Sequence, residues 1–559
     1  MWPIMTKNGG CHYMMITAYL NLVDQIVKQK FKSVKNSCFE IGSEITKYFE
    51  MLADKSPLKM LYKKMLAVTD IDLKTKLQEE LRTKMQPGSI DVNIMTKLDR
   101  TNYSPDRKEL PSEFSDALAA LRGYAQSTLT SAIVLSAGIN RRLYTYFEKF
   151  EDFYADATGF IKKKIILKVS DYRSSIIQGR FFAKKGLWIS EYRVESGLNC
   201  GGHAFASDGF LLGPILNEFK NKKTELISSL HAIYNKALKR KRNVSFDQPH
   251  DIYITAQGGI GTYNEDQFLL NYFEIDGTGW ATPFLLVPEA TNVDQPTLDK
   301  LSAAGESDLY LSGVSPLGVP FNNLRGNSSD TEKERHIEMN RPGSACPKGH
   351  LVSNTEFTEK PICSASRQYQ KLKLDQLEKL KLSTKAFKVK FDAVVKKSCI
   401  CNDLAASPLI NHKLGKSNEK HFTAICPGPN MAYFTTTSSL KEMVSHIYGR
   451  INLLNTTYRP NMFIKELKMY VEYLKNEVKN RSIEPTEKDI SYCNEFKNNL
   501  LEGVDYYAQL FPQMIQETEE YRQNILLELE SYKKRIELFV SQNTDVFKKK
   551  LPSLTLANL

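Results

Sequence analysis

The spacing of apolar and polar residues divides the chain into a helical part and a strand-rich part. Residues before Pro87 carry apolar side chains three and four positions apart, which is the period of an amphipathic helix. This pattern predicts helices over Tyr19–Phe31, Ile45–Leu66 and Leu73–Met85. We therefore expect residues 1–87 to form an N-terminal helical extension.

After Pro87 the pattern changes to short apolar or β-branched runs that alternate with helix-like segments. The predicted strands are Ser89–Met95, Ser131–Ala137, Lys164–Val169, Leu187–Val194, Ile252–Ala256 and Thr278–Leu286. The predicted helices between them are Phe114–Tyr124, Leu143–Phe153, Leu211–Phe219 and Thr224–Lys239. Strand and helix in this alternation indicate βαβ units and a parallel sheet. Enough such units would close into an α/β fold of the (β/α)8 type, with sites at the carboxyl ends of its strands.

A glycine-rich segment follows the predicted strand that ends at Ala256. It reads Gln-Gly-Gly-Ile-Gly-Thr over 257–262 and leads into the helix-like stretch Asn264–Leu270. Glycines at a strand end let backbone N–H groups converge, and the N-terminus of the next helix favours negative charge. The segment is therefore typical of a phosphate site, which Thr282 in the next predicted strand could complete.

A second glycine-rich segment, Gly197–His203, follows the strand that ends at Val194 and reads Gly-Leu-Asn-Cys-Gly-Gly-His. Imidazole titrates near neutral pH, so His203 at the end of a strand is a candidate for proton transfer. The alternative is an ordinary turn beside a histidine whose hydrogen bonds are satisfied.

The order of these segments resembles the FMN-dependent nitronate monooxygenase and type II enoyl-acyl-carrier-protein reductase family, whose members are TIM barrels. The resemblance covers about residues 88–295. It is carried by Val92–Met95, Gly197–His203, Ala256–Ile260 and Ala281–Phe284. The chain departs from the family pattern at Asn199, Cys200 and Ala281.

The resemblance implies an FMN-dependent oxidoreductase that acts on a small-molecule substrate, a carbon acid or a nitronate. His203 would be the catalytic residue. The implied FMN-binding residues are Asn93, Lys168, Gly201, Gly202, Gly258, Gly259, Ile260, Ala281 and Thr282. Two alternatives stay open. One is an enoyl-thioester reductase that uses NAD(P)H, and the other is a flavin-free barrel that serves as a scaffold or binding protein.

Charged residues near the predicted strand ends have two interpretations each. Asp171 and Arg173 follow the strand that contains Lys168, where they could bind a charged substrate, or Asp171 could cap a helix. Glu191, Arg193 and Glu195 alternate along one predicted strand and should therefore share a face, as a charge network or as a catalytic set. The turn-rich residues 312–326 are expected to pack over the site, or else to form a tight connection.

Five of the nine cysteines lie between residues 340 and 430. Cys363, Cys399, Cys401 and Cys426 are candidates for a four-thiolate site for zinc or an iron–sulfur cluster. Unbound structural thiols are the alternative, because Cys-x-Cys is not the spacing of the usual zinc or ferredoxin sites. Nine cysteines in 559 residues fit reduced thiols better than a disulfide framework.

Composition changes this picture little. The chain is 42% hydrophobic and 25% charged, with a net charge of +12 that is spread along the sequence, and we expect no nucleic-acid role. No apolar run is long enough for a membrane span and no secretory signal is recognised, so we expect a cytoplasmic protein. Beyond the barrel core at 88–300 we expect a cysteine-containing insertion or lid at 301–435 and helices at 436–559. These helices could meet a protein partner or form a homo-oligomer.

Overall fold

The centre of the fold is a six-stranded parallel sheet in the order β1-β2-β3-β4-β5-β6. The structure is a computed structural model and describes residues 11–94, 99–104, 106, 108–136, 138–199, 208–414, 421–481, 485–514 and 517–547. The strands are β1 (Asp91–Ile94), β2 (Ser131–Leu135), β3 (Lys163–Val169), β4 (Ile189–Glu195), β5 (Tyr253–Gln257) and β6 (Gly277–Gly279). All five neighbouring pairs are parallel. The prediction of a parallel α/β sheet is confirmed.

The expected eight-stranded barrel is not formed by the described residues. Two further strands, β7 (Leu309–Ser312) and β8 (Phe321–Leu324), pair with each other in antiparallel fashion and form a separate hairpin. The predicted strand Thr278–Leu286 is also mostly wrong. Only Thr278 and Gly279 of it belong to β6, and Pro283 then lies in the first turn of a 3₁₀ helix over Thr282–Leu286. Proline fits a first helical turn because it lacks the N–H that a strand would use.

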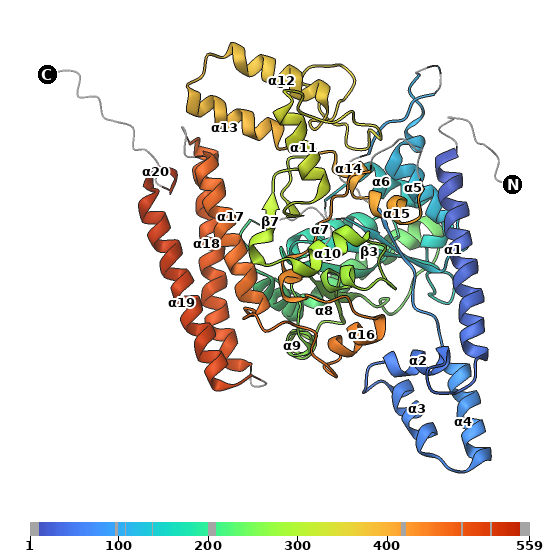
Figure 1. The fold of residues 1–559 in the computed structure, drawn as a ribbon. Coiled ribbons are helices and arrows are strands. Elements are labelled where there is room, and N and C mark those ends of the chain that lie inside the picture. The colour runs from blue at the N-terminus through green and yellow to red at the C-terminus, as the bar shows by residue number, and fades with distance from the viewer. Residues whose placement is uncertain are drawn as a thin grey trace.

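Helices cover the outer face of this sheet. They are α5 (Asp116–Ala125), α6 (Arg141–Tyr146), α7 (Tyr172–Ala183), α8 (Leu212–Arg242) and α9 (Tyr263–Tyr272). Alternate residues of β3, namely Ile165, Leu167 and Val169, are buried in the same cluster as residues of these helices. Helix α8 is continuous, although two helices were predicted. Figure 1 shows the sheet and these helices in the middle of the molecule.

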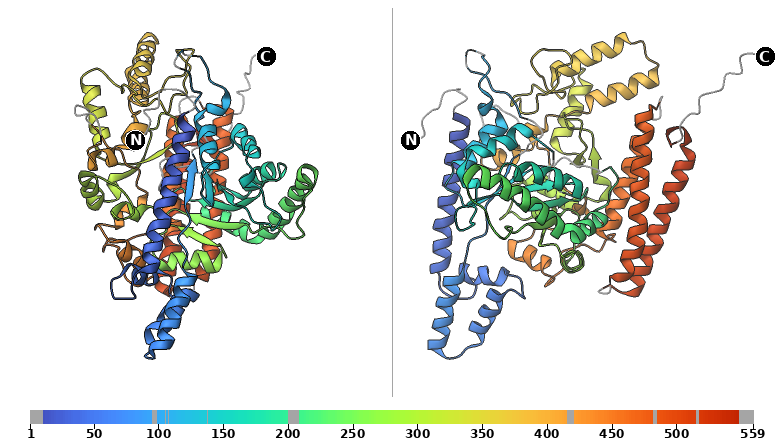
Figure 2. Two further views of the ribbon diagram at one scale, coloured as in Figure 1. Left: turned by 90° about the vertical axis from the view of Figure 1, so that its right-hand side faces the viewer. Right: turned by 180° about the vertical axis from the view of Figure 1, so that it is seen from behind.

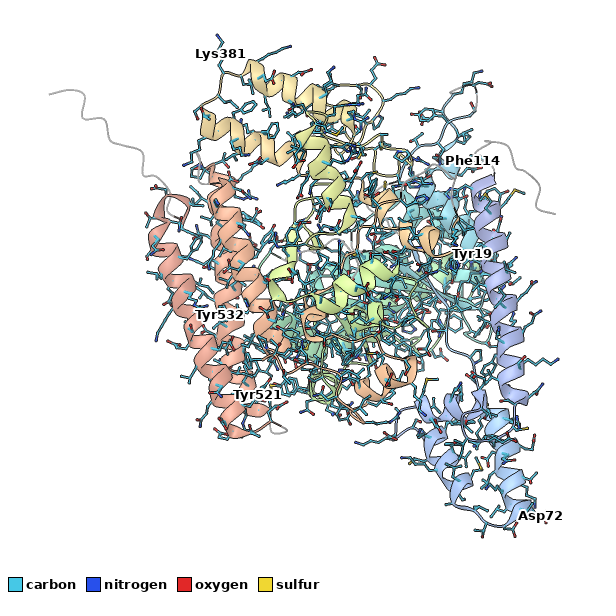
Figure 3. The ribbon with its side chains drawn as sticks, viewed as in Figure 1. Tyr19, Asp72, Phe114, Lys381, Tyr521 and Tyr532 are labelled. Carbon is cyan, nitrogen blue, oxygen red and sulfur yellow. The ribbon has the colours of Figure 1, made fainter. Side chains whose placement is uncertain are left out.

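The N-terminal helices form one side of the molecule. Helix α1 (Cys11–Asn36) packs along α5, and α2 (Glu44–Met51), α3 (Pro57–Ala67) and α4 (Ile71–Lys84) share a small core of their own. The single helix predicted over 45–66 is broken, because Ser56 accepts the amide of Lys59 and begins a new helix with Pro57. Figure 3 shows Asp72 at the tip of this lobe, away from the sheet.

Residues 295–411 contribute short helices and a projecting helical hairpin. The helices are α10 (Gln295–Ala303), α11 (Ser328–Glu338), α12 (Arg367–Lys379), α13 (Thr384–Val395), α14 (Ile400–Asp403) and α15 (Ala406–Asn411). Helices α12 and α13 pack against each other and extend away from the body, with Lys381 at their joining turn (Figures 1 and 3).

The C-terminal helices are α16 (Leu440–Ile447), α17 (Met462–Arg481), α18 (Glu487–Leu510), α19 (Glu519–Gln542) and α20 (Thr544–Phe547). Helices α17 to α19 stand side by side on the side of the sheet opposite α1 (Figure 2). The long helix predicted over 506–539 is interrupted after Leu510, where Pro512 lies in a 3₁₀ turn. Phe463, Leu467 and Tyr470 of α17 belong to the same core as the sheet. In the part of the chain that the structure describes, no helix is both long and apolar enough to cross a membrane.

Candidate functional site

A hydrogen-bonded polar network lies at the carboxyl ends of β3, β4 and β5. Its centre is Glu195, the last residue of β4. The Oε1 atom of Glu195 lies 3.1 Å from Nζ of Lys168 and accepts hydrogen bonds from Gln257 Nε2 at 2.6 Å and Asn199 Nδ2 at 2.7 Å. Parallel register puts Glu195 opposite Gln257, and Lys168 lies on the same face of the sheet. The network brings one ammonium and two amide groups to a single edge.

A second charged network lies on the same face of the sheet, closer to the amino ends of the strands. Arg193 Nε is 2.8 Å from Glu191 Oε1 and Arg193 Nη2 is 3.5 Å from Asp91 Oδ2, while Thr255 Oγ1 donates to Glu191 at 2.6 Å. Burial raises the pKa of Asp91, and Arg193 opposes this change. Glu191, Arg193 and Glu195 therefore share a face, as predicted, and form charge networks.

Asn93 lies on the neighbouring strand β1 and is exposed at this side of the sheet. Its register partner on β2 is Val134. The structure thus describes two of the predicted flavin-side residues, Asn93 and Lys168, on the inner face of the sheet. The other three, Gly201, Gly202 and His203, lie outside the described residues, as does Cys200.

The glycine-rich segment after β5 turns sharply against the segment after β4. Gly258 has φ +101° and Gly259 has φ +82°. A Cβ atom on Gly258 would lie 2.8 Å from the Cα of Asn199, and one on Gly259 would lie 2.7 Å from Leu198 Cδ1. Both positions therefore require glycine for backbone conformation and for packing against residues 198–199.

The backbone carbonyl groups of this segment are bound by a residue about 170 positions later in the chain. Asn430 Nδ2 donates to the carbonyl oxygens of Gly259 and Ile260 at 2.6 and 2.9 Å. No acceptor among the described residues takes the N–H of Gly258, Gly259 or Ile260. Three backbone donors that lack an acceptor among the described residues thus lie at the end of a strand, where such groups can bind an anion.

A buried ion pair lies beside these donors. Thr262 caps α9, and Glu265 in its first turn accepts the N–H of Gly261 at 2.9 Å and of Met462 at 2.8 Å. Arg459 binds both oxygens of Glu265, at 2.7 and 2.8 Å, with both side chains almost fully buried. Arg459 Nη2 also donates to the carbonyl of Gly259 at 2.7 Å. The carboxylate thus occupies the α9 N-terminus, and its charge is offset by Arg459.

The segment after β6 lies next to the same glycines. Gly279 is in register with Gln257, and a Cβ on Gly279 would lie 2.8 Å from Gln257 Cβ. Ala281 is exposed and Thr282 is buried. Ala281 and Thr282 therefore follow the end of the strand that pairs with β5, and their part in a phosphate site stays a prediction.

Glu466 on α17 fixes both ends of the segment that contains His203. It accepts hydrogen bonds from Ser196 Oγ at 2.8 Å, Gly197 N at 3.4 Å and Leu212 N at 2.8 Å. The side chain is fully enclosed, and burial raises its pKa from 4.5 to about 7. Sequence reasoning missed Glu466 because nothing in its neighbourhood on α17 marks it as different from other helix carboxylates.

A cleft of 730 Å³ opens at the carboxyl end of β2. One wall is Gly138–Arg141, and another is Pro316, Leu317 and Val319, with Ser353 and Asn354 beside them. Asn322 of β8 donates to the carbonyl of Asn199 at 3.1 Å. Part of the turn-rich segment 312–326 therefore lines the cleft at the sheet edge, although it also contains β8, which was not predicted.

Asp171 caps a helix. Its Oδ1 accepts the N–H of Ser174 at 2.6 Å in the first turn of α7. Of the two interpretations open for Asp171, the structure supports the helix cap.

The predicted four-thiolate metal site is not present as a set of ligands. Among the described residues, no three His, Cys, Asp or Glu side chains are grouped so as to hold a metal ion. Cys363 is instead buried in a small hydrophobic cluster, against which Cys346 and Cys401 pack. Cys426 packs against the same hydrophobic cluster without completing a ligand set.

Comparison with known proteins identifies no family. No family model and no curated protein matches the chain. A search of solved structures finds the enoyl reductase domain of MlnA from the macrolactin biosynthesis cluster of Bacillus amyloliquefaciens, at 13% sequence identity and a TM-score of 0.33. The match covers 81% of this chain and 88% of that chain. A likeness at this TM-score is too weak to assign a fold or a function.

Proposed function

We propose that the chain is an FMN-dependent oxidoreductase that oxidises a small carbon acid or a nitronate. One observation carries the proposal. Lys168, Gln257 and the N–H groups of Gly258–Ile260, which lack acceptors among the described residues, lie at one edge of a parallel sheet. Such an edge is where α/β folds bind ligands, and these groups suit the polar rim and the phosphate of FMN.

In this proposal the residues have separate roles. Gly258, Gly259 and Ile260, with Ala281 and Thr282, hold the phosphate through their backbone N–H groups, while Lys168 and Asn93 lie at the ring. Glu195 keeps the Lys168 ammonium in position at the edge. FMN, when bound, supplies the redox chemistry. His203 orients the substrate or takes its proton.

The first test is the visible absorption spectrum of the purified chain, followed by titration with FMN. A two-banded flavin spectrum, or uptake of added FMN, is expected. A colourless chain that takes up no FMN would end the proposal. With FMN bound, two assays separate the two flavin activities. One measures the oxidation of nitronates, and the other measures the consumption of NAD(P)H in the presence of an enoyl thioester.

Lys168 has a matched control on its own strand. Lys164 lies on the same face of β3 but at the other end, and it is exposed. We expect Lys168→Met to weaken FMN binding at least tenfold, because it removes the ammonium from the edge, while Lys164→Met leaves the affinity unchanged. Equal effects of both changes would show only a general loss of positive charge.

His203→Ala tests the catalytic role. Turnover should fall while FMN binding and the circular dichroism spectrum stay unchanged. Unchanged turnover would remove His203 from the mechanism.

A second candidate function is a flavin-free scaffold. The observation that favours it is the Glu265 carboxylate at the N-terminus of α9, where it accepts the N–H of Gly261. If Glu265 serves instead of a phosphate, the chain takes up no FMN and Glu265→Gln changes only its stability.

A further inference from the structure

The helical hairpin formed by α12 and α13 carries a large share of the positive charge. Between Arg367 and Lys397 the chain has ten basic and three acidic residues, which gives a net charge of +7, whereas the whole chain has a net charge of +12. More than half of the net charge therefore lies on 31 of the 559 residues, although it was expected to be spread along the sequence.

This hairpin stands out from the body of the molecule (Figures 1 and 3). The two helices pack against each other, and Lys381 lies in the turn at their far end. The lysines of the hairpin are Lys371, Lys373, Lys379, Lys381, Lys385, Lys388, Lys390, Lys396 and Lys397. Seven of these nine side chains are exposed, and only Lys373 and Lys397 are half-buried.

Most of these lysines are not neutralised by the protein. Lys373 pairs with Glu356 at 2.6 Å and Lys388 pairs with Asp392 at 3.3 Å. For the other seven lysines, no carboxylate among the described residues lies within ion-pair distance. Exposed cations that lack a carboxylate produce a positive potential around the hairpin, which attracts an anionic surface.

The hairpin also exposes large apolar side chains between its lysines. Leu380 is 54% exposed and directly precedes Lys381, and Val389 is 56% exposed between Lys388 and Lys390. Apolar side chains next to lysines suit the boundary between water and lipid, because the apolar groups enter among the headgroups while the ammonium groups stay with anionic phosphates and carboxylates.

The base of the hairpin is attached to the body close to the cleft at the sheet edge. Gln370 Nε2 of α12 donates to the carbonyl of Lys397 at 3.2 Å. Lys397 Nζ in turn donates to the carbonyls of Gly313 and Ser315, both at 2.9 Å. Residues 316 and 317, which follow directly, line the cleft. A surface that binds the outer part of the hairpin would therefore hold the chain through a segment next to the cleft.

The residue types of the hairpin favour a lipid surface over a nucleic acid. Nine of its ten cationic residues are lysines, and none of its aromatic side chains, Tyr369, Phe387 and Phe391, is exposed. Proteins that bind nucleic acids commonly use arginine forks at base edges and exposed aromatic rings on which bases stack. An anionic lipid surface requires only point charges and apolar groups, which this hairpin has.

We propose that the hairpin α12–α13 is a docking surface for a membrane that contains anionic phospholipids. Lys379, Lys381 and Lys385, at the far end of the hairpin, contact the anionic headgroups. Leu380 enters the boundary between the headgroups and the acyl chains. This docking does not depend on whether FMN binds at the sheet.

The test is co-sedimentation of the full chain with lipid vesicles. One set of vesicles contains only phosphatidylcholine, and the other contains phosphatidylcholine and phosphatidylserine. We expect the chain to sediment with the vesicles that contain phosphatidylserine and to stay in solution with the neutral ones. Binding should weaken as the salt concentration rises, because salt screens the attraction between exposed charges.

A triple variant tests the lysines at the far end. One lysine near an anionic membrane contributes about fivefold to the affinity, so Lys379→Gln, Lys381→Gln and Lys385→Gln together should weaken binding on the order of a hundredfold. The matched control is Lys30→Gln, Lys32→Gln and Lys64→Gln, which removes three exposed lysines of α1 and α3. The control lowers the net charge equally and should leave the affinity unchanged.

A second pair of variants tests the apolar contact. Leu380→Gln should weaken binding about tenfold, because a leucine side chain gains free energy when it leaves water and glutamine does not. Leu66→Gln on α3 is its control, because Leu66 is 55% exposed but lies far from the hairpin. Circular dichroism checks that all four variants keep the fold of the parent.

Four outcomes would overturn the proposal. The first is no sedimentation with either kind of vesicle, and the second is equal sedimentation with both kinds. The third is an equal loss of affinity in the two triple variants, which would assign binding to the charge of the whole molecule. The fourth is displacement of the chain from the vesicles by RNA whose own binding is lost in the hairpin triple variant, which would make the hairpin a nucleic-acid surface.

Discussion

Glu466 gives the sharpest prediction about stability. Its carboxyl group is enclosed by the protein, and burial raises its pKa from 4.5 to about 7. In the unfolded chain this group ionises above about pH 4.5, whereas in the folded chain it ionises only above about pH 7. The folded state therefore holds the proton more tightly, and the resulting stability is fully present below pH 4.5 and is lost as the pH rises to 7.

The size of the effect follows from the two pKa values. One pKa unit corresponds to about 1.4 kcal/mol, so the rise from 4.5 to about 7 corresponds to about 3 kcal/mol. Glu466→Gln keeps the shape of the protonated side chain and cannot ionise. We expect the free energy of unfolding of the parent, minus that of the variant, to fall by about 3 kcal/mol between pH 4.5 and 7.5.

Urea titrations followed by circular dichroism at pH 4.5, 5.5, 6.5 and 7.5 measure this difference. Glu502→Gln on α18 is the control, because it makes the same carboxylate-to-amide change at an exposed position. A parent-minus-variant difference for Glu466→Gln that does not change with pH would refute the reasoning.

Three further changes test other contacts by urea denaturation. Gly258→Ala should lower the free energy of unfolding by about 2–4 kcal/mol, because alanine is strained in the left-handed region and its Cβ would clash with Asn199. Gly42→Ala is the control, because Gly42 has φ +80° but open space around it, and it should lower the free energy of unfolding by only about 1 kcal/mol. Equal losses in the two variants would exclude the clash. Arg459→Met should lower the free energy of unfolding by about 3–5 kcal/mol, because it leaves the Glu265 carboxylate buried and unpaired. Adding Glu265→Gln to this variant should recover part of the lost stability, and no recovery would contradict the ion-pair explanation. Lys163→Met should lower the free energy of unfolding by about 2–4 kcal/mol, because Lys163 Nζ donates to the carbonyls of Tyr124 and Ser127 at 2.8 Å. A loss below about 1 kcal/mol would show that water replaces the ammonium as the donor to these carbonyls.

The strands could be predicted because their side chains face two environments. In β3 and β5, residues that face the helices are buried and, except for Lys163, apolar, and those on the other face are mixed, so the runs of β-branched residues mark both position and direction. The sixth strand was overextended because its apolar residues continue through Pro283, where the chain turns into a 3₁₀ helix. The closure of a barrel could not be read from the strands, because it depends on residues beyond β6 pairing with the sheet.

The sequence predicts only those parts of the candidate site that are formed by residues adjacent along the chain. Gly258 and Gly259 are marked by their own residue type and by the strand before them. Glu195, Gln257 and Asn199 were not identified as one network, although each lies at a predicted strand end, because their shared atom is set by strand register. Arg459 and Glu466 lie too far along the chain for any spacing argument to connect them with residues 196–212 or 258–265.

These distant contacts bear on the order of folding during synthesis. The sheet strands are complete in the chain once Gly279 has been made, but the turns after β4 and β5 also form hydrogen bonds with Asn430, Arg459 and Glu466. Roughly two hundred residues must therefore emerge from the ribosome before the strand-end turns can settle, and contacts of such sequence separation are slow to form. A nascent sheet in this interval is a species on which a chaperone would act.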